Sequence, residues 1–301
     1  MVRLLTFILV LFVFLLSGGD KVLIWEVTAP ALPGKVYVAG SIHSGKAQWY
    51  PLDAAYDRAL DASSAVYFEI FQPDNRKIGQ LTMMEGVFRN GKTLSQTIGY
   101  ADFQEVCRFY AKLAPGSGMD QPMMLERFRP WFLSIQISQY YLMKHPEISR
   151  EYGLEKVFTK NLGKRQGFSL ESEESQLLAM SKISDQAAGR LLMDGIRDFA
   201  NAGRNLQRIF HGLETGEINE IAMIANEMAF KHPEFHTSLF LKRNQNIADK
   251  IYRMLKEKQI IFVLVGAGHL AGKGNILEFL REKGCTTVQL KRLNKPGRIK
   301  P

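Results

Sequence analysis

Two histidines occupy the same short motif at opposite ends of the chain. Gly40-Ser41-Ile42-His43 and Gly266-Ala267-Gly268-His269 both have the pattern Gly-x-x-His. Each motif follows a short apolar run, residues 36–39 and 260–265, that predicts a strand buried on both faces. Ligands of parallel α/β sheets bind beyond the carboxyl ends of the strands, so we expect both imidazoles at one site.

Two carboxylates stand at equivalent positions. Glu69 lies at the end of the strand predicted over residues 65–70, and Glu171 at the end of the one over 166–171. Two imidazoles with one or two carboxylates suit a divalent metal that keeps a coordination position for water. Each residue alone is more often structural: a histidine hydrogen-bonded after a strand, or a solvated glutamate. The repeated motif and the matching carboxylates together favour a functional site.

Other motifs compete weakly with this prediction. Gly266-Ala267-Gly268 begins a dinucleotide-binding pattern that Ala271 completes, but the acidic residue expected about 20 positions later is missing. Among the remaining histidines, only His236 is kept in reserve as a site residue. Gly40 and Gly266 are expected to turn the chain with positive φ.

The amino terminus resembles an export signal. Thirteen residues from Leu4 to Leu16 carry no charge, and the small residues Ser17 and Gly19 suit cleavage before Asp20. We therefore expect residues 1–19 to be a signal peptide and the protein to be periplasmic or secreted. The apolar segment is shorter than the roughly 20 residues of a membrane span. An uncleaved amino-terminal anchor remains the alternative.

Charge and cysteine content narrow the function. The net charge is +9, but five basic residues and no acidic one lie between Lys291 and Pro301. This predicts a loose basic tail, 293–301, with some attraction to an anionic membrane surface and no nucleic-acid partner. Only Cys107 and Cys285 are present, which excludes a disulfide framework and a cysteine zinc cluster. Two unpaired, buried thiols are expected, and one long-range bridge remains open.

The chain alternates strands at its ends with long helical stretches. We predict one α/β domain, 20–292, in which both ends of the chain form a modest mixed or mainly parallel sheet. Helical insertions at about 74–165 and 172–256 cover it. A turn at Pro33-Gly34 predicts an initial hairpin. The predicted strands are 22–27, 35–39, 65–70, 166–171, 259–265 and 286–290, and the main predicted helices are 52–60, 100–114, 130–143, 173–193, 194–215, 217–231, 239–256 and 275–283.

Several motifs in order resemble the TraB/GumN family, which includes the pheromone-shutdown proteins and the Tiki metalloproteases. The resemblance spans nearly the whole chain after residue 20. It rests on both Gly-x-x-His motifs and on a series of shorter segments: 23–27, 50–52, 59–60, 68–70, 129–131, 153–155, 170–172 with Gln176, 243–244 and Gly284. Ser41 stands where the family often has Thr, and Glu155 where it often has Asp. Glu155 is therefore a secondary candidate.

The resemblance implies a fold of the kind shared with erythromycin esterase and a haem-binding lipoprotein family. In the Tiki branch it implies peptide cleavage supported by manganese or cobalt. Carried over to this chain, metal-ligand or catalytic roles fall on four residues, His43, Glu69, Glu171 and His269. Arg243 and Asn244 match a family pair that orients or neutralises an anionic group.

These observations favour an exported metal-dependent hydrolase, a peptidase acting on a peptide or protein with manganese, cobalt or zinc. The metal would activate water, Glu69 or Glu171 would act as the base, and Arg243 would steady the oxyanion. The alternative from another class is a non-catalytic protein that sequesters a peptide or haem-like ligand with the same histidines. A third reading is an idle scaffold. The oligomeric state is left open.

Overall fold

A computed structural model describes residues 19–89 and 91–301 of the chain. Of the expected signal peptide, residues 1–19, all but Gly19 lie outside these residues. In the described part no helix is both long and apolar enough to cross a membrane.

A six-stranded mixed sheet forms one layer of the molecule, in the order β4-β3-β5-β2-β1-β6. Three of its five pairings are parallel, β2 with β5, β5 with β3 and β3 with β4. The antiparallel hairpin expected at the start of the chain is confirmed as β1 and β2. The strands are β1 (Lys21–Thr28), β2 (Lys35–Ser41), β3 (Ala65–Phe68), β4 (Gln166–Ser169), β5 (Ile260–Gly266) and β6 (Thr286–Lys291).

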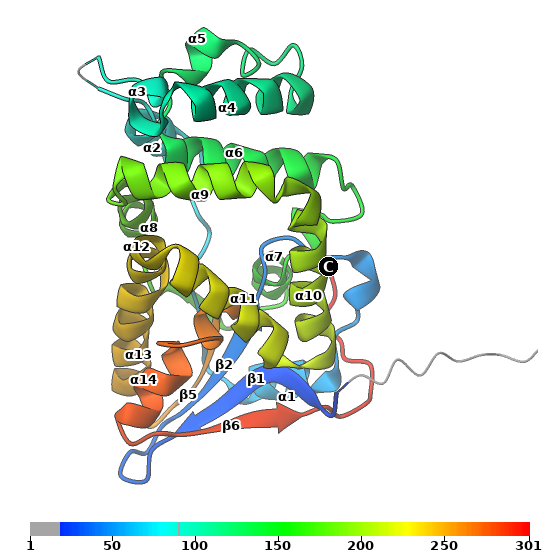
Figure 1. Ribbon diagram of the computed structural model, residues 1–301. Coiled ribbons are helices and arrows are strands. Elements are labelled where there is room, and N and C mark those ends of the chain that lie inside the picture. The colour runs from blue at the N-terminus through cyan, green and yellow to red at the C-terminus, as the bar shows by residue number, and fades with distance from the viewer. Residues whose placement is uncertain (1–18, 90) are drawn as a thin grey trace, which may run out of the picture.

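Helices fill the long stretches between the strands (Figure 1). The α/β class predicted from the sequence is confirmed, with a mixed and mostly parallel sheet. The helices are α1 (Ala54–Ala62), α2 (Asn75–Gly86), α3 (Leu94–Ile98), α4 (Tyr100–Leu113), α5 (Pro122–Leu125), α6 (Pro130–Met143), α7 (Leu154–Lys160), α8 (Glu173–Ser181), α9 (Asp185–Arg197), α10 (Ala202–Thr215), α11 (Ile218–Lys231), α12 (Pro233–His236), α13 (Lys242–Met254) and α14 (Ile276–Glu282). Short helical turns are η1 (Ala47–Trp49), η2 (Arg150–Tyr152), η3 (Phe199–Asn201), the π-helix η4 (Thr237–Leu241) and η5 (Ala267–Leu270).

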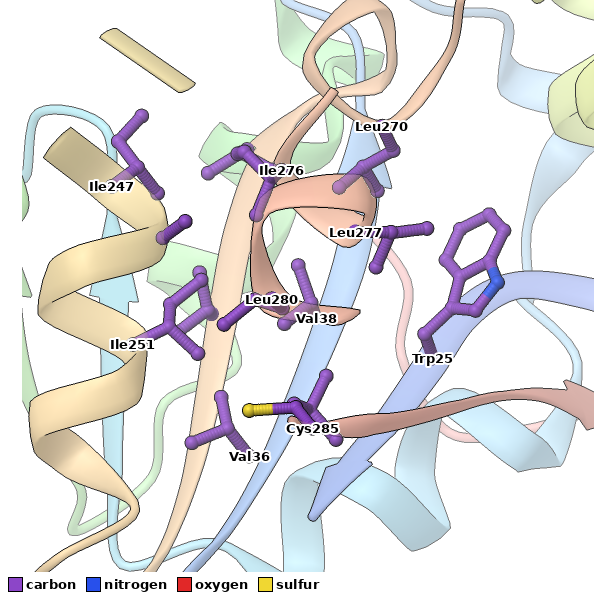
Figure 2. Packing of buried hydrophobic residues seen from close by; sticks show 14 of the residues in the cluster. Trp25, Val36, Val38, Ile247, Ile251, Leu270, Ile276, Leu277, Leu280 and Cys285 are labelled. Carbon is purple, nitrogen blue, oxygen red and sulfur yellow. The ribbon is translucent and has the colours of Figure 1, made fainter. Parts of the chain in front are cut away.

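Apolar side chains cover both faces of the central strands. In β5, residues 261–265 are all buried, as an unalternating apolar run predicts for a strand between two layers. On one face α13 and α14 pack their apolar sides against β2 and β5, and Figure 2 shows Ile251 and Leu280 beside Val36 and Val38. On the other face α1 and α7 pack through a second apolar cluster.

A separate apolar cluster holds together the helices farthest from the sheet. It contains the buried Trp131 and Leu133 of α6 and Leu192 of α9, and these two helices lie side by side in Figure 1. The hairpin of α10 and α11 runs between this helical lobe and the sheet. The ends of the strands therefore lie within a surround of helices.

Two predicted helices are wrong in their extent. The helix expected over 173–193 is divided into α8 and α9, because Ser184 caps α9 by accepting a hydrogen bond from Ala187 N. The helix expected over 194–215 is likewise divided, since α9 ends at Arg197 and α10 begins at Ala202. A serine cap within an apolar periodicity marks the first of these breaks, whereas α10 begins after Asn201 without a side-chain cap.

The basic tail is bound to the domain, so the expected loose terminus is wrong. Asp53 accepts hydrogen bonds from Leu293 N and Asn294 N, each at 3.0 Å. Ile299 is buried in the cluster beneath α1, and its carbonyl accepts from Leu52 N. Neither cysteine forms a disulfide, and Cys285 is buried whereas Cys107 is half-buried.

Candidate functional site

The parallel strands bring the predicted residues to one edge of the sheet. His43 follows β2, Glu69 follows β3, Glu171 follows β4, and His269 lies in η5 directly after β5. β3 and β4 continue to pair beyond their ends, because Glu171 N donates to Glu69 O at 2.9 Å. This places the two glutamates next to each other.

Arg243, in the first turn of α13, binds both glutamates. Its Nη2 donates to Glu69 Oε2 at 2.8 Å and to Glu171 Oε2 at 2.6 Å, and its Nε donates to Glu171 at 2.9 Å. The side chains of all three are largely buried, with 14% of Arg243 and 10% of each glutamate exposed. Gln176 Nε2 donates to Glu69 Oε2 as well, at 3.0 Å. Arg243 Nε also lies 3.1 Å from Glu171 Oε1, so both oxygens of Glu171 accept from one guanidinium.

One lone pair of Glu69 is left over. Its Oε1 accepts a hydrogen bond from Gly266 N at 2.6 Å and lies 3.6 Å from His269 Nε2, which is too long for a hydrogen bond. Burial opposes ionisation of Glu69, but the Arg243 guanidinium and the Gly266 N–H favour it, and a protonated His269 would add to them, so the pKa of Glu69 is lowered. Glu69 is therefore an ionised carboxylate with one acceptor position directed at His269.

Asn244 fixes the tautomer of His269. Its Nδ2 donates to the carbonyl of Gly274 at 2.7 Å, so its Oδ1 is the atom that faces His269 Nδ1, at 2.5 Å. An amide oxygen only accepts, and Nδ1 must therefore carry the hydrogen. Burial lowers the pKa of His269, which keeps the ring neutral at neutral pH. Nε2 then holds a lone pair that faces the Glu69 carboxylate.

Two lone pairs at this separation require an electropositive partner between them. A water that donates both hydrogens fits, and so does a cation. Two ligands about 2.1 Å from a tetrahedral ion are separated by roughly 3.4 Å, close to the observed distance. The pair of His269 and Glu69 therefore fits a divalent metal, which accords with the second ring nitrogen being held by Asn244. Within the described residues, no three His, Cys, Asp or Glu side chains are grouped to hold one ion.

His43 has different surroundings. Its Nδ1 lies 3.1 Å from Glu155 Oε1, at the first turn of α7, and 78% of its side chain is exposed. Hydrogen bonding to Glu155 and the charge of that carboxylate raise the pKa of His43 to about 9. Ser41 Oγ donates to the same Glu155 oxygen at 2.5 Å. The other oxygen, Oε2, is buried and has no hydrogen-bond partner among the described residues.

Glycines at the site provide room for close contacts. A Cβ on Gly153 would lie 2.2 Å from the carbonyl oxygen of His43, and one on Gly266 would lie 3.2 Å from Glu69 Oε1. Neither Gly40 nor Gly266 has a positive φ, so the expected left-handed turn at both is wrong. Gly266 has φ −51° and is needed because its N–H must approach Glu69.

An aromatic wall beside His269 was not predicted. The ring centroid of Phe240, in η4, lies 5.1 Å from that of His269, and the ring of His236 stacks on Phe240 at 5.9 Å. His236, the reserve candidate, thus reaches the site only through Phe240. Phe240 precedes Arg243 by three residues, a spacing that puts two side chains on the same side of a helix. This spacing could have suggested that Phe240 lies near the site, although the π-helix itself has no clear sequence pattern.

A protein family and a protein of another organism are similar to this chain over most of its length. The family described as TraB/PrgY/gumN matches residues 23–289, a range that includes every residue of the site. An uncharacterized protein of Treponema pallidum (strain Nichols) is 21% identical over 284 residues, which cover 89% of this chain and 82% of that protein. No solved structure matches the chain. The match over residues 23–289 shows that the chain belongs to the TraB/PrgY/gumN family.

Proposed function

We propose that the protein is an exported metal-dependent hydrolase that cleaves a peptide or protein substrate at the site of Glu69 and His269. One observation carries the proposal: the lone pair of His269 Nε2 faces an ionised carboxylate oxygen at 3.6 Å. Such a pair, with its outer partners already fixed by Asn244 and Gly266, binds an electropositive centre. Family membership supports a site at these residues, since the family match includes both motifs.

Two donors of the chain would hold the ion, His269 through Nε2 and Glu69 through Oε1. When bound, a manganese, cobalt or zinc ion would lower the pKa of water towards neutrality and polarise a carbonyl group. Arg243 and Gln176 hold the second oxygen of Glu69, which keeps the carboxylate in one orientation. Arg243 also binds Glu171. We therefore assign to Arg243 the role of orienting these two carboxylates, in place of the oxyanion binding expected from the sequence.

We assign proton transfer to His43, in place of the ligand role expected from its motif. Glu155 holds Nδ1, and the exposed ring leaves the other nitrogen open to solvent. Its raised pKa makes His43 a proton donor at neutral pH, which suits protonation of a leaving amine. His43 is close enough for its charge to act on Glu69 and His269.

Cleavage of a peptide library by purified protein tests the proposal. After chelation and addition of manganese, cobalt or zinc, we expect turnover that is lost in His269→Gln and reduced at least about 100-fold in His43→Gln. His211→Gln is the matched control, because His211 is exposed and pairs with Glu220 on α11. Retention of peptide without turnover under every metal would instead identify a sequestering protein.

Export is part of the proposal and has its own test. Residues 1–19 would be removed before Asp20, so the amino-terminal sequence of the protein from the extracytoplasmic fraction should begin at Asp20. A protein that keeps Met1 and sediments with membranes would favour the uncleaved anchor. A full-length protein in the cytoplasmic fraction would contradict export.

A further inference from the structure

A pocket opens beside the site, and Glu171 and Arg243 are part of its lining. Its volume is about 660 Å³, within the range of small-ligand sites. Glu171 and Arg243 form the wall shared with the site. The rest of the lining comes from α8 and the residue after it, from α12 with η4, and from α13: Ser175, Leu178, Ala179, Lys182, Pro233, Glu234, Thr237, Ser238, Lys242 and Asn246.

All carboxylates in this pocket already have donors. Both oxygens of Glu171 accept from Arg243. Those of Glu234 accept from Ser184, one from its N–H and the other from its hydroxyl at 2.8 Å. Each of these oxygens therefore has a donor from the chain itself, and Glu234 is the one carboxylate of the lining without a cationic partner among the described residues.

The donors in the pocket are, by contrast, mostly free. The ammonium groups of Lys182 and Lys242 have no ion-pair or hydrogen-bond partner within the described ranges, and neither has the hydroxyl of Thr237 or the amide of Asn246. Arg243 Nη1 donates to Leu239 O, which uses one of its two hydrogens. The pocket thus offers surplus donors, two of them positively charged, to a ligand that can only accept.

We propose that this pocket binds a carboxylate side chain of an acidic peptide. Lys182 and Lys242 would supply the charge, and Thr237 and Asn246 would supply neutral hydrogen bonds. Leu178, Ala179 and Pro233 give the lining an apolar part that fits the methylene groups of a glutamate. The assignment of this peptide as the substrate rests on the proposed function, but the binding itself does not.

The pocket's position links binding to the site. Arg243 lines the pocket and also holds Glu69, which faces His269. A peptide with its carboxylate in the pocket would therefore pass close to the His269 side of the sheet edge. The pocket would select peptides with an acidic residue near the bond to be cleaved.

Calorimetric titration with two blocked peptides tests the proposal without any turnover. The probes are an acetylated, amidated tetrapeptide of glutamates and its glutamine counterpart, both added to metal-free protein. We expect the glutamate peptide to bind and the glutamine peptide to bind at least about tenfold more weakly. Lys182→Met with Lys242→Met should weaken the glutamate peptide by a similar factor, and arginine at both positions should restore it.

Lys164 and Lys258 provide the matched control. Both are exposed, and they precede β4 and β5, so they lie at the opposite edge of the sheet. Lys164→Met with Lys258→Met changes the net charge equally and should leave binding unchanged. Equal affinity for both peptides, or equal loss in both double variants, would overturn the proposal. Selective binding here, together with no turnover in the metal-loaded peptide-library assay, would retain the pocket and reject the hydrolase. Turnover in that assay without selective binding here would retain the hydrolase and reject the pocket.

Discussion

The two Gly-x-x-His motifs have the same position in the sheet and opposite environments. They follow paired parallel strands in register, with Ser41 opposite Gly266. His43 is exposed and contacts a carboxylate, Glu155, whereas His269 is buried and contacts an amide, Asn244. The first contact raises the pKa of its histidine, and burial lowers the pKa of the other.

The difference shows that the motif fixes the position of each histidine at the end of its strand but does not determine the charge of the imidazole. The partner that sets it comes from a helix distant in sequence, α7 for His43 and α13 for His269. At neutral pH the site therefore holds one imidazolium and one neutral imidazole. One is suited to giving a proton and the other to binding an electropositive centre.

Removing Arg243 should give the largest loss of stability, because it disrupts the buried surroundings of His269. Arg243→Met leaves Glu69 and Glu171 buried without their common cation, and we expect unfolding in urea to show a loss of about 3 to 5 kcal/mol. The neighbouring Lys242→Met removes an exposed charge and should change stability by less than about 0.5 kcal/mol. A loss equal to that of the control would mean that the buried ion pairs are not formed.

Asn244→Ala should have the next largest effect. It leaves the Nδ1–H of His269 and the carbonyl of Gly274 without their partner, at an expected loss of about 2 kcal/mol. It should also free the ring to change tautomer, which nitrogen chemical shifts of His269 would report. Gln245→Ala, at the exposed next position, is the control, and an unchanged tautomer would contradict the role given to Asn244.

Glu155→Gln should make His43 more like His269. Without the carboxylate charge the pKa of His43 should fall by roughly 1 to 2 units, as measured by proton NMR titration of the ring. Glu151→Gln, which removes a nearby exposed carboxylate of η2 that pairs with Lys156, should leave that pKa unchanged. If both variants gave the wild-type titration, the contact of His43 with Glu155 would not exist in solution.

The smallest effect concerns pH and stability. A raised pKa means that His43 stabilises the fold fully below its unfolded value of about 6.5 and loses this contribution as the pH rises through about 9. Because the ring is exposed, we expect only a few tenths of a kcal/mol between wild type and His43→Gln. Urea unfolding across that pH range measures it, and a gap that widens with rising pH would contradict the sign.

The strand ends could be predicted from the sequence, because buried parallel strands have an apolar run that few other elements share. The runs before Gly40 and Gly266 correctly placed β2 and β5, and Glu69 and Glu171 at strand ends became neighbours. The break at Ser184 was missed, since the apolar periodicity continues across it and only the cap marks it.

Side-chain partners at the site could not be predicted in the same way. Arg243 and Asn244 were expected near an anionic group, but only the packing of α13 shows that they hold Glu69, Glu171 and His269. The pairing of Ser41 and His43 with Glu155 depends on α7, whose first residue, Leu154, is tied to Ile42 by a backbone hydrogen bond. Such contacts are tertiary, and no spacing in the sequence encodes them.

The protonation of the two histidines at neutral pH is the most direct test. Nitrogen-15 NMR of histidine-labelled protein, with His43→Gln and His269→Gln for assignment, distinguishes neutral tautomers from the imidazolium ion. We expect His269 to be neutral with its proton on Nδ1, and His43 to be doubly protonated. A protonated His269, or a neutral His43, would contradict the distinction between the two motifs.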